Sequence, residues 1–237
     1  MKSRKWLLVL LGSWFFFSPL SGFHGNLLPA SEKNPSSLPQ PGDYLPKISF
    51  PNSLSHEEVR YLGIDPKKAL SLDEIKGKII LIEFINSNCL YCIKAVPILK
   101  QIYQAIDEDT NLKGAVKILA IGAGDTKTEV VHFKNNYEIP YPVIPDTEYK
   151  AHDAVGGPRV PFLFVATKSP KKRWFVVRAQ VGFVETLESE TIVFFDEDWR
   201  DADGRGKQPS SVEDFIQELK TILAKVGGTS GPNKPSR

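Results

Sequence analysis

A run of apolar residues that ends in a pair of cysteines constrains the fold of this chain more than any other feature. Residues 79–85 are apolar on both alternating faces except for Glu83, which is typical of a central strand covered on both sides. After this run the apolar residues take the helical period, and the resulting stripe consists of Val96, Leu99, Ile102, Tyr103 and Ile106. Cys89 and Cys92 therefore lie where a buried strand becomes a helix.

The rest of the sequence alternates strand and helix patterns. Residues 116–121 predict a second apolar strand, and residues 126–137 predict a helix. The apolar side of that helix is formed by Val130, Val131 and Phe133. An apolar strand at 162–165 is expected to pair as a hairpin with residues 174–184. This alternation predicts an α/β fold with a mixed, partly parallel central sheet flanked by helices.

A final helix is predicted after the capping box Ser210-x-x-Glu213. Its apolar stripe consists of Phe215, Ile216, Leu219, Ile222 and Leu223. Gly227 is expected to end the helix, and residues 227–237 are expected to form a disordered tail.

The N-terminus is typical of an export signal. Three basic residues among the first five precede the apolar stretch 6–17, which is too short to span a bilayer comfortably. We therefore predict that residues 1–22 are a signal peptide or an uncleaved N-terminal anchor, and that the protein is exported to the periplasm. Residues 23–58 are rich in proline and serine, and their apolar residues follow neither the helical nor the strand period. They therefore predict a linker that precedes a domain at 59–226.

The charge balance argues against nucleic acid as a partner. The formal net charge is +2, and beyond the N-terminal stretch 27 basic residues are matched by 28 acidic ones. No basic stripe stands out. Within the domain, residues 185–209 form an acidic insertion that contains the apolar stretch Ile192-Val193-Phe194-Phe195. Such a segment is either a solvated loop or a strand that docks a partner.

The spacing of the two cysteines predicts redox chemistry. A cysteine in the first turn of a helix faces free backbone N–H groups and the positive end of the helix dipole, which favour the thiolate. Cys89 is therefore the predicted nucleophile, and Cys92, one turn later, is close enough to resolve a mixed disulfide. Glu83 interrupts a buried strand six residues before Cys89, and we predict that it passes a proton to or from Cys92.

Other uses of the same cysteines remain open. They could form an inert local disulfide, or half of a zinc site that needs two further ligands. A binding module could hold Cu(I) between the two thiolates, with a histidine such as His132 or His152 as third ligand. A redox-inert scaffold is a further alternative.

The segment from Phe84 to Cys92, Phe-Ile-Asn-Ser-Asn-Cys-Leu-Tyr-Cys, is followed by Pro97. It resembles the active-site segment of thioredoxin-fold proteins, and most of all that of the exported TlpA/ResA-like group. The resemblance covers residues 59–226 and implies a thioredoxin-like fold with a helix kinked at Pro97. It also implies a cis-proline that faces the cysteines, and Val160-Pro161 matches that position.

The resemblance implies an exported thiol-disulfide oxidoreductase that uses no metal and no organic cofactor. The backbone of Val160, beside Pro161, would pair with an extended substrate strand, and Leu90 and Tyr91 would contact the substrate. The implied partners are protein thiols and disulfides, together with a membrane electron donor or acceptor. We favour a reductase, and the alternative is a disulfide-forming oxidase, because Val rather than Thr precedes Pro161, as in DsbA-type proteins.

Several positions depart from the family pattern. Asn88 replaces the usual Trp before the first cysteine, and Ala95 stands where ResA-like proteins have Glu. The pair Phe162-Leu163 differs from the Glu-Thr of the cytochrome c maturation branch. These departures leave the redox direction and the substrate open. A peroxidase of the peroxiredoxin type is disfavoured, because Asn86 and Ile82 replace the hydroxyl residue and the proline that it needs.

Overall fold

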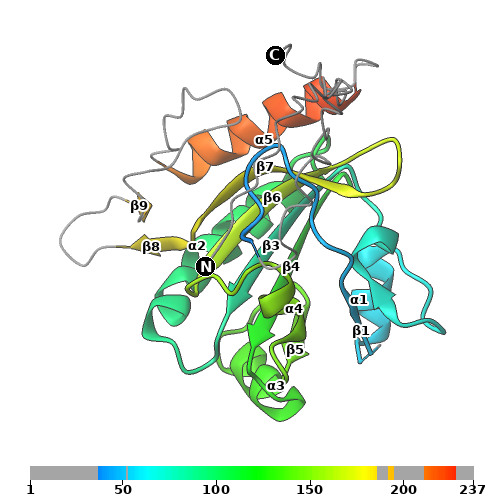
Figure 1. Cartoon of the computed structure of the whole chain (residues 1–237). Coiled ribbons are helices and arrows are strands. Elements are labelled where there is room, and N and C mark those ends of the chain that lie inside the picture. The colour runs from blue at the N-terminus through cyan, green and yellow to red at the C-terminus, as the bar shows by residue number, and fades with distance from the viewer. Residues whose placement is uncertain (1–36, 52, 186–191, 195–210, 228–237) are drawn as a thin grey trace, which may run out of the picture. The chain divides into compact units, whose positions relative to one another are not determined.

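A five-stranded mixed sheet lies at the centre of the fold (Figure 1). The structure, a computed structural model, describes residues 37–51, 53–185, 192–194 and 211–227, which all belong to one compact unit, Lys33–Arg237. In sheet order the strands are β5 (Val143–Asp146), β4 (Val116–Ala123), β3 (Ile79–Ile85), β6 (Phe162–Lys168) and β7 (Trp174–Val181). β3, β4 and β5 are parallel, whereas β6 and β7 join antiparallel. The predicted α/β fold with a mixed central sheet is confirmed.

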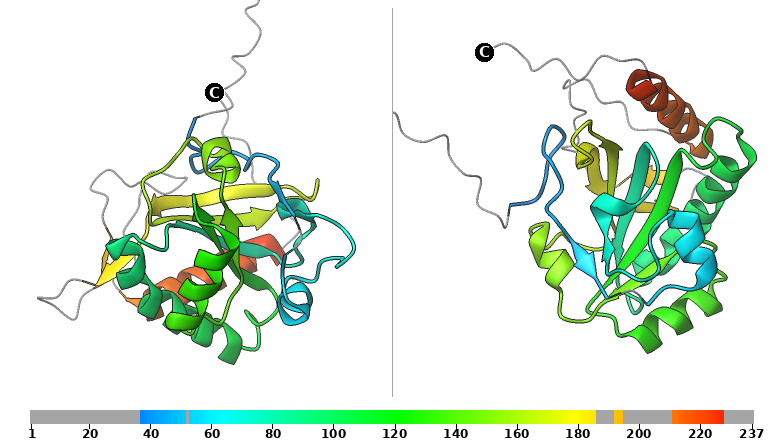
Figure 2. Two further views of the ribbon diagram at one scale, coloured as in Figure 1. Left: turned by 90° about the horizontal axis from the view of Figure 1, so that it is seen from below. Right: turned by 90° about the vertical axis from the view of Figure 1, so that its right-hand side faces the viewer.

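β3 is buried on both faces because its side chains enter two separate cores. The core on one face, here called the α2 face, includes Ile79, Leu81 and Ile85. The core on the other face, the α4 face, includes Ile80, Ile82 and Phe84. The α2 face is covered by α2 (Leu90–Glu108), α3 (Lys127–Asn136) and α5 (Val212–Gly227). The α4 face is covered by α1 (His56–Leu62) and α4 (Lys150–Ala154), and the right-hand view of Figure 2 shows α4 and α5 on opposite sides of the sheet.

The helices begin close to the predicted positions. α3 starts after a capping box between Thr126 and Glu129. Its inner side is formed by Val130 and Phe133, whereas Val131, predicted on the apolar side, is exposed, since neighbouring residues on a helix point in different directions.

The predicted cap of the last helix is shifted by one residue. The hydroxyl of Ser211 accepts a hydrogen bond from the backbone N–H of Asp214 at 3.1 Å, so Ser211 caps α5. Ser210, the predicted cap, lies outside the described residues. Ser210 precedes Glu213 by three residues, and Ser211 precedes Asp214 by the same number. The sequence pattern alone does not distinguish these two possible caps.

The linker prediction is wrong for residues 38–51, which pack against the sheet, and for residues 56–58, which begin α1. The buried apolar side chains of this segment include Leu45, Ile48 and Phe50. The backbone N–H of Gly42 donates to the carbonyl of Val176 in β7 at 3.0 Å, and β1 (Ser49–Phe50) pairs with β2 (Leu70–Ser71). The segment has no strand period because its prolines interrupt regular pairing along the sheet edge. The short 3₁₀ helix η1 (Leu72–Glu74) follows β2.

The predicted hairpin at 174–184 is divided into two strands. β7 ends at Val181, and β8 (Phe183–Glu185) pairs antiparallel with β9 (Ile192–Phe194) in a separate two-stranded sheet. Part of the apolar stretch in the predicted insertion is therefore a strand. Residues 186–191 and 195–209 of the insertion, the predicted signal at 1–22, the linker residues 23–36 and the tail from 228 lie outside the described residues. Within the described part of the chain, no helix is both long and apolar enough to cross a membrane.

Candidate active site

The two cysteines lie at the N-terminus of α2. Cys89 is the N-cap residue, and its Sγ accepts a hydrogen bond from the backbone N–H of Cys92 at 3.4 Å. Both thiols are free. Cys89 is partly exposed, whereas only 1% of Cys92 is exposed. An incoming disulfide can therefore reach Cys89 while Cys92 stays covered by the core.

The turn between β3 and α2 is fixed by a buried carboxylate on the neighbouring strand. Asp125, just after β4, accepts hydrogen bonds from the backbone N–H of Ser87 at 2.9 Å and from the Ser87 hydroxyl at 2.8 Å. The side-chain amide of Asn86 donates to Asp125 at 3.1 Å and to the carbonyl of Ala123 at 2.9 Å. Burial raises the pKa of Asp125, and the bonds from Ser87 oppose this shift.

Two glycines at the end of β4 make room for neighbouring side chains: Gly122, within β4, for the Asp125 carboxylate, and Gly124, just after it, for Tyr149. A Cβ atom on Gly122 would lie 2.6 Å from a carboxylate oxygen of Asp125, and one on Gly124, where φ is +79°, would collide with the ring of Tyr149. Parallel strands bring their carboxyl ends to one edge of the sheet, and so the polar residues after β3 and β4 meet there. Asp125 was not among the predicted site residues, although its place after a glycine turn at a strand end was a signal that could have identified it.

Val160 and Pro161 lie opposite Cys89. The peptide bond between them is cis, which is the conformation that the resemblance implied. The Sγ of Cys89 lies 3.8 Å from the carbonyl oxygen of Val160, within the reach of a weak S–H hydrogen bond. Pro161 is buried and its carbonyl accepts a hydrogen bond from the N–H of Gly182 at 2.7 Å.

Gly182 is a second residue that the sequence analysis missed. A Cβ atom at this position would lie 2.9 Å from the Cβ of Pro161 and 3.4 Å from Oε1 of Glu83. The missing side chain therefore leaves space for both the proline and the buried acid. A single glycine in a strand pattern often indicates such a close approach.

Glu83 is buried in the middle of β3, with 3% of its surface exposed. Its Oε1 has no hydrogen-bond partner among the residues that the structure describes. Burial raises the pKa of Glu83 from its usual 4.5 to about 8. Burial also raises the pKa of the Cys92 thiol, and the charge of Glu83 adds to this effect. The predicted neighbours Glu83 and Cys92 thus interact electrostatically inside the core.

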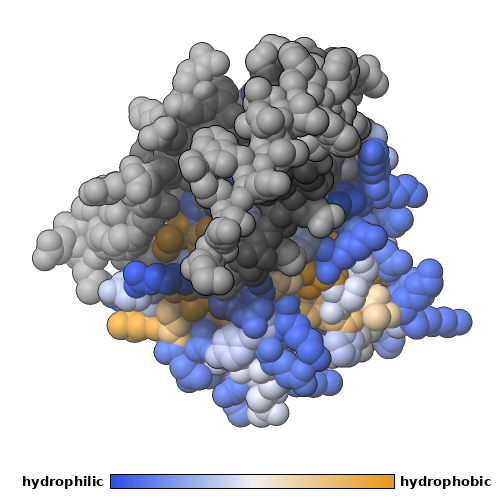
Figure 3. All heavy atoms as spheres, in the orientation of Figure 1, coloured by the Kyte–Doolittle hydropathy of each residue, from blue (hydrophilic) through white to orange (hydrophobic). Residues whose placement is uncertain are grey.

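Leu90 and Tyr91, the predicted substrate contacts, are the first two residues of α2. They are 60% and 53% exposed, the highest fractions among the large apolar side chains of the described chain. The Nζ of Lys94 lies over the ring of Tyr91, 5.9 Å from the ring centroid. Figure 3 shows apolar surface at the lower left, over α2. Cys89 therefore sits beside exposed apolar side chains.

The histidines considered as metal ligands are not part of this cluster. His132 is exposed on α3, and Nε2 of His152 lies 2.8 Å from the carbonyl oxygen of Pro158. In the part of the chain that the structure describes, no three His, Cys, Asp or Glu side chains are grouped as metal ligands would be.

Comparisons with known proteins agree with this geometry. Residues 43–185 match the model of the AhpC/TSA family. The thiol-disulfide oxidoreductase ResA of Bacillus anthracis is 31% identical over 104 residues, which cover 44% of this chain and 57% of ResA. ResA of Bacillus subtilis is 27% identical over 104 residues, covering 44% of this chain and 55% of the relative. The matched region thus spans little more than half the length of these curated relatives.

Solved structures show the same fold at low sequence identity. A hypothetical protein from Sinorhizobium meliloti has a TM-score of 0.51 at 16% identity, over 83% of this chain and 90% of the other. A putative thiol:disulfide interchange protein DsbE from Chlorobium tepidum has a TM-score of 0.50 at 16% identity, over 78% of this chain and 98% of the other. The predicted thioredoxin-like fold and the resemblance to ResA-type proteins are confirmed.

Proposed function

The chain belongs to the AhpC/TSA family, and we propose that it is an exported thiol-disulfide oxidoreductase that acts on protein substrates through Cys89 and Cys92. One observation carries the proposal. A partly exposed sulfur at the start of a helix lies one turn from a buried sulfur. The buried acid Glu83, whose Oε1 has no partner among the described residues, interacts with the second sulfur.

In the first step, the Cys89 thiolate attacks one sulfur of a substrate disulfide. The substrate S–S bond breaks, a mixed disulfide forms between Cys89 and the substrate, and the other substrate sulfur leaves as a thiolate that takes a proton from water. The N–H of Cys92, which already donates to Sγ of Cys89, supports negative charge on that sulfur.

In the second step, Cys92 resolves the mixed disulfide. Burial holds the Cys92 proton in place, so a base must remove it before the sulfur can attack. Glu83 in its ionised form is the proposed base, because its raised pKa of about 8 makes its carboxylate a stronger proton acceptor than an exposed one. The Cys92 thiolate then attacks Sγ of Cys89, the bond between Cys89 and the substrate breaks, and an internal disulfide forms. The second substrate sulfur leaves as a thiolate that takes a proton from water. Two electrons pass from the protein to the substrate.

An extended substrate segment is proposed to lie beside Val160. The carbonyl of Val160 is close to Sγ of Cys89. A substrate strand that paired with the backbone of Val160 would therefore bring a substrate cystine next to the nucleophile. Leu90 and Tyr91 are proposed to pack against apolar substrate side chains, because both are exposed on the same helix turn as Cys89. This arrangement would favour extended substrates with apolar residues near the cystine.

A reductase supplied with electrons by a membrane donor is the proposed direction, and a disulfide-forming oxidase is the alternative. The reduction potential of the Cys89/Cys92 couple distinguishes them. Equilibration in thiol-disulfide buffers, followed by alkylation and mass measurement, should give a value near that of thioredoxin, about −270 mV. A value near that of DsbA, about −120 mV, would instead identify an oxidant. Residues 1–22 are proposed to direct export to the periplasm, either as a cleaved signal or as an anchor.

The proposed activity is tested by the reduction of insulin disulfides by the full-length chain, with dithiothreitol as the electron source. The wild type should accelerate insulin reduction, and Cys89→Ser should remove the acceleration. An unchanged rate in Cys89→Ser would contradict the proposal. Titration with Cu(I) is the matched control for the binding-module alternative. Stoichiometric binding that depends on His132 or His152, without insulin reduction, would favour a metal-binding protein.

A further inference from the structure

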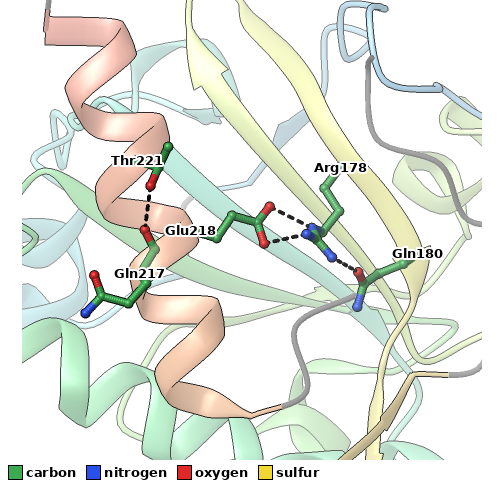
Figure 4. A network of polar contacts seen from close by, with 5 residues as sticks. All are labelled: Arg178, Gln180, Gln217, Glu218 and Thr221. Atoms are coloured by element: carbon green, nitrogen blue, oxygen red, sulfur yellow. Dashed lines mark hydrogen bonds and ion pairs between the residues drawn. The ribbon is translucent and has the colours of Figure 1, made fainter. Parts of the chain in front are cut away.

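An ion pair between a buried arginine and a partly exposed glutamate joins β7 to α5 on the α2 face of the sheet (Figure 4). Arg178 of β7 is buried, and its guanidinium makes two contacts with the carboxylate of Glu218 in α5, one of them from Nε at 3.2 Å. Nη1 of the same guanidinium donates to Oε1 of Gln180 at 2.9 Å. Buried ion pairs contribute little net stability compared with apolar packing. This pair does, however, fix the orientation of the Gln180 amide.

Gln180 is left with a buried donor. Its Oε1 is occupied by Arg178, and in Figure 4 its amide nitrogen points away from the guanidinium. Nε2 has no hydrogen-bond partner within the described residues, although only 1% of Gln180 is exposed. A buried polar group without a partner costs free energy, so a partner for this donor is expected nearby.

The unpartnered oxygen of Glu83 lies in the same row of the sheet. Glu83 pairs with Leu163 across β3 and β6, and Leu163 pairs with Gln180 across β6 and β7. Residues directly opposite in adjacent strands share a face, so Glu83 and Gln180 both point to the α2 face. Two strand spacings separate their Cα atoms by about 10 Å.

The Glu83 carboxylate extends toward β7. Its Oε1 lies 3.4 Å from the position of a Cβ atom on Gly182, and Gly182 follows Gln180 by two residues. The acceptor of Glu83 and the donor of Gln180, neither of them paired within the described residues, therefore lie on the same face of the sheet on either side of Leu163. A buried water commonly bridges polar groups that are too far apart for direct contact.

We propose that Gln180 is a positioning residue for Glu83, and that its amide, oriented by Arg178 and Glu218, donates to the Glu83 carboxylate through one buried water. The proposal rests on the proton-transfer role proposed above for Glu83. A donor directed at the carboxylate stabilises its ionised form. Gln180 would thereby extend the pH range in which Glu83 can accept the Cys92 proton.

Other groups also face Glu83 and must be kept constant in a test. Cys92 on α2 and Tyr141, just before β5, both interact with its charge. Arg178 and Glu218 lie further along the α2 face. The directly paired residues, Ala120 on β4 and Leu163 on β6, are apolar. Gln180→Met keeps all of these residues and removes only the acceptor of Nη1 of Arg178.

The test is the titration of Glu83 in the reduced full-length chain, followed by carboxyl ¹³C NMR and assigned by comparison with Glu83→Gln. In Gln180→Met, the midpoint of the Glu83 titration should rise by about one pH unit, because the charged carboxylate loses one hydrogen bond. Arg178→Met should shift this midpoint in the same direction. Gln217→Ala, on the exposed side of α5 next to Glu218, should leave it unchanged.

A second measurement needs no substitution at Gln180. The Nε2 proton signals of Gln180 in the wild type should change with the midpoint of Glu83, and should stay constant in Glu83→Gln. Gln180 signals that do not change as Glu83 titrates would overturn the proposal. An unshifted Glu83 titration midpoint in folded Gln180→Met would also overturn it. If these shifts appear but the chain does not reduce insulin, the positioning role holds while the proposed function fails.

Discussion

The carboxylate of Asp125 binds both hydrogen-bond donors of Ser87, at 2.9 Å from the backbone nitrogen and 2.8 Å from the hydroxyl. Ser87 is two residues before Cys89, so this contact fixes the turn that places the nucleophile at the start of α2. Asp125, which follows β4, thus holds the active-site turn that follows the neighbouring parallel strand β3.

Asp125→Ala should therefore lower both stability and the rate of disulfide exchange. Loss of the carboxylate leaves the N–H and the hydroxyl of Ser87 without their acceptor, and the Asn86 amide keeps only the Ala123 carbonyl, which should reduce the free energy of unfolding by about 2–4 kcal/mol. Urea denaturation and insulin reduction measure the two effects. Thr126→Ala is the control, because it removes the cap of α3 at about 1 kcal/mol without touching the turn. Equal exchange rates in the two variants would contradict a role for Asp125 in placing Cys89.

Gly182→Ala should disturb the site from the opposite side. The added methyl group would lie 2.9 Å from the Cβ of Pro161, so the proline must move away, and overpacking of this kind costs about 1–3 kcal/mol. We expect lower stability and slower exchange. Gly227→Ala is the matched control, since a Cβ atom there meets nothing within 4 Å. A Gly182→Ala variant with wild-type exchange would show that the close approach is unimportant.

Glu83 should make the stability of the reduced protein fall with rising pH. Its pKa is about 8 in the folded state and 4.5 in the unfolded state, so between these values the folded state binds more protons. The free energy of unfolding should therefore decrease across this window by up to about 1.4 kcal/mol per pH unit, and change no further above pH 8 from this cause. Glu83→Gln should lack the slope, as urea denaturation at several pH values can show. Parallel curves for the two proteins would contradict a buried acid at this position.

The same substitution should slow the resolution of the mixed disulfide. A positioned general base contributes about 100-fold or more to a proton transfer, and Glu83→Gln removes the base next to Cys92. Rapid mixing of a preformed mixed disulfide, with the release of the substrate thiol as signal, measures this step alone. Glu108→Gln, at the far end of α2, should behave as the wild type. In the wild type the rate should rise with pH toward about 8 and then level off, as Glu83 ionises.

The central strand and the cysteine helix could be predicted because local patterns determine them. The apolar run at 79–85 coincides with β3, and the change of period identifies the start of α2. The packing of residues 38–51 could not be predicted, because prolines remove the strand period from a segment that pairs only at an edge.

The support around the cysteines depends on contacts between distant parts of the chain. Asp125 and Ser87 are 38 residues apart, and no local pattern connects them. Arg178 and Gln180 look like the solvent side of an edge strand, and only α5 reveals that they are buried. Gly182 carries no side chain, and its role becomes visible only beside Pro161 and Glu83.

The most direct test of the account is the reaction of oxidised glutathione with the two single-cysteine variants, followed by mass measurement at intervals. Cys92→Ser should form a stable glutathione adduct on Cys89, and Cys89→Ser should react at least about tenfold more slowly, because its remaining thiol is buried. The wild type should pass through the adduct to an internal disulfide. Equal rates in the two variants, or an adduct that persists in the wild type, would contradict the assignment of Cys89 as nucleophile and Cys92 as resolving cysteine.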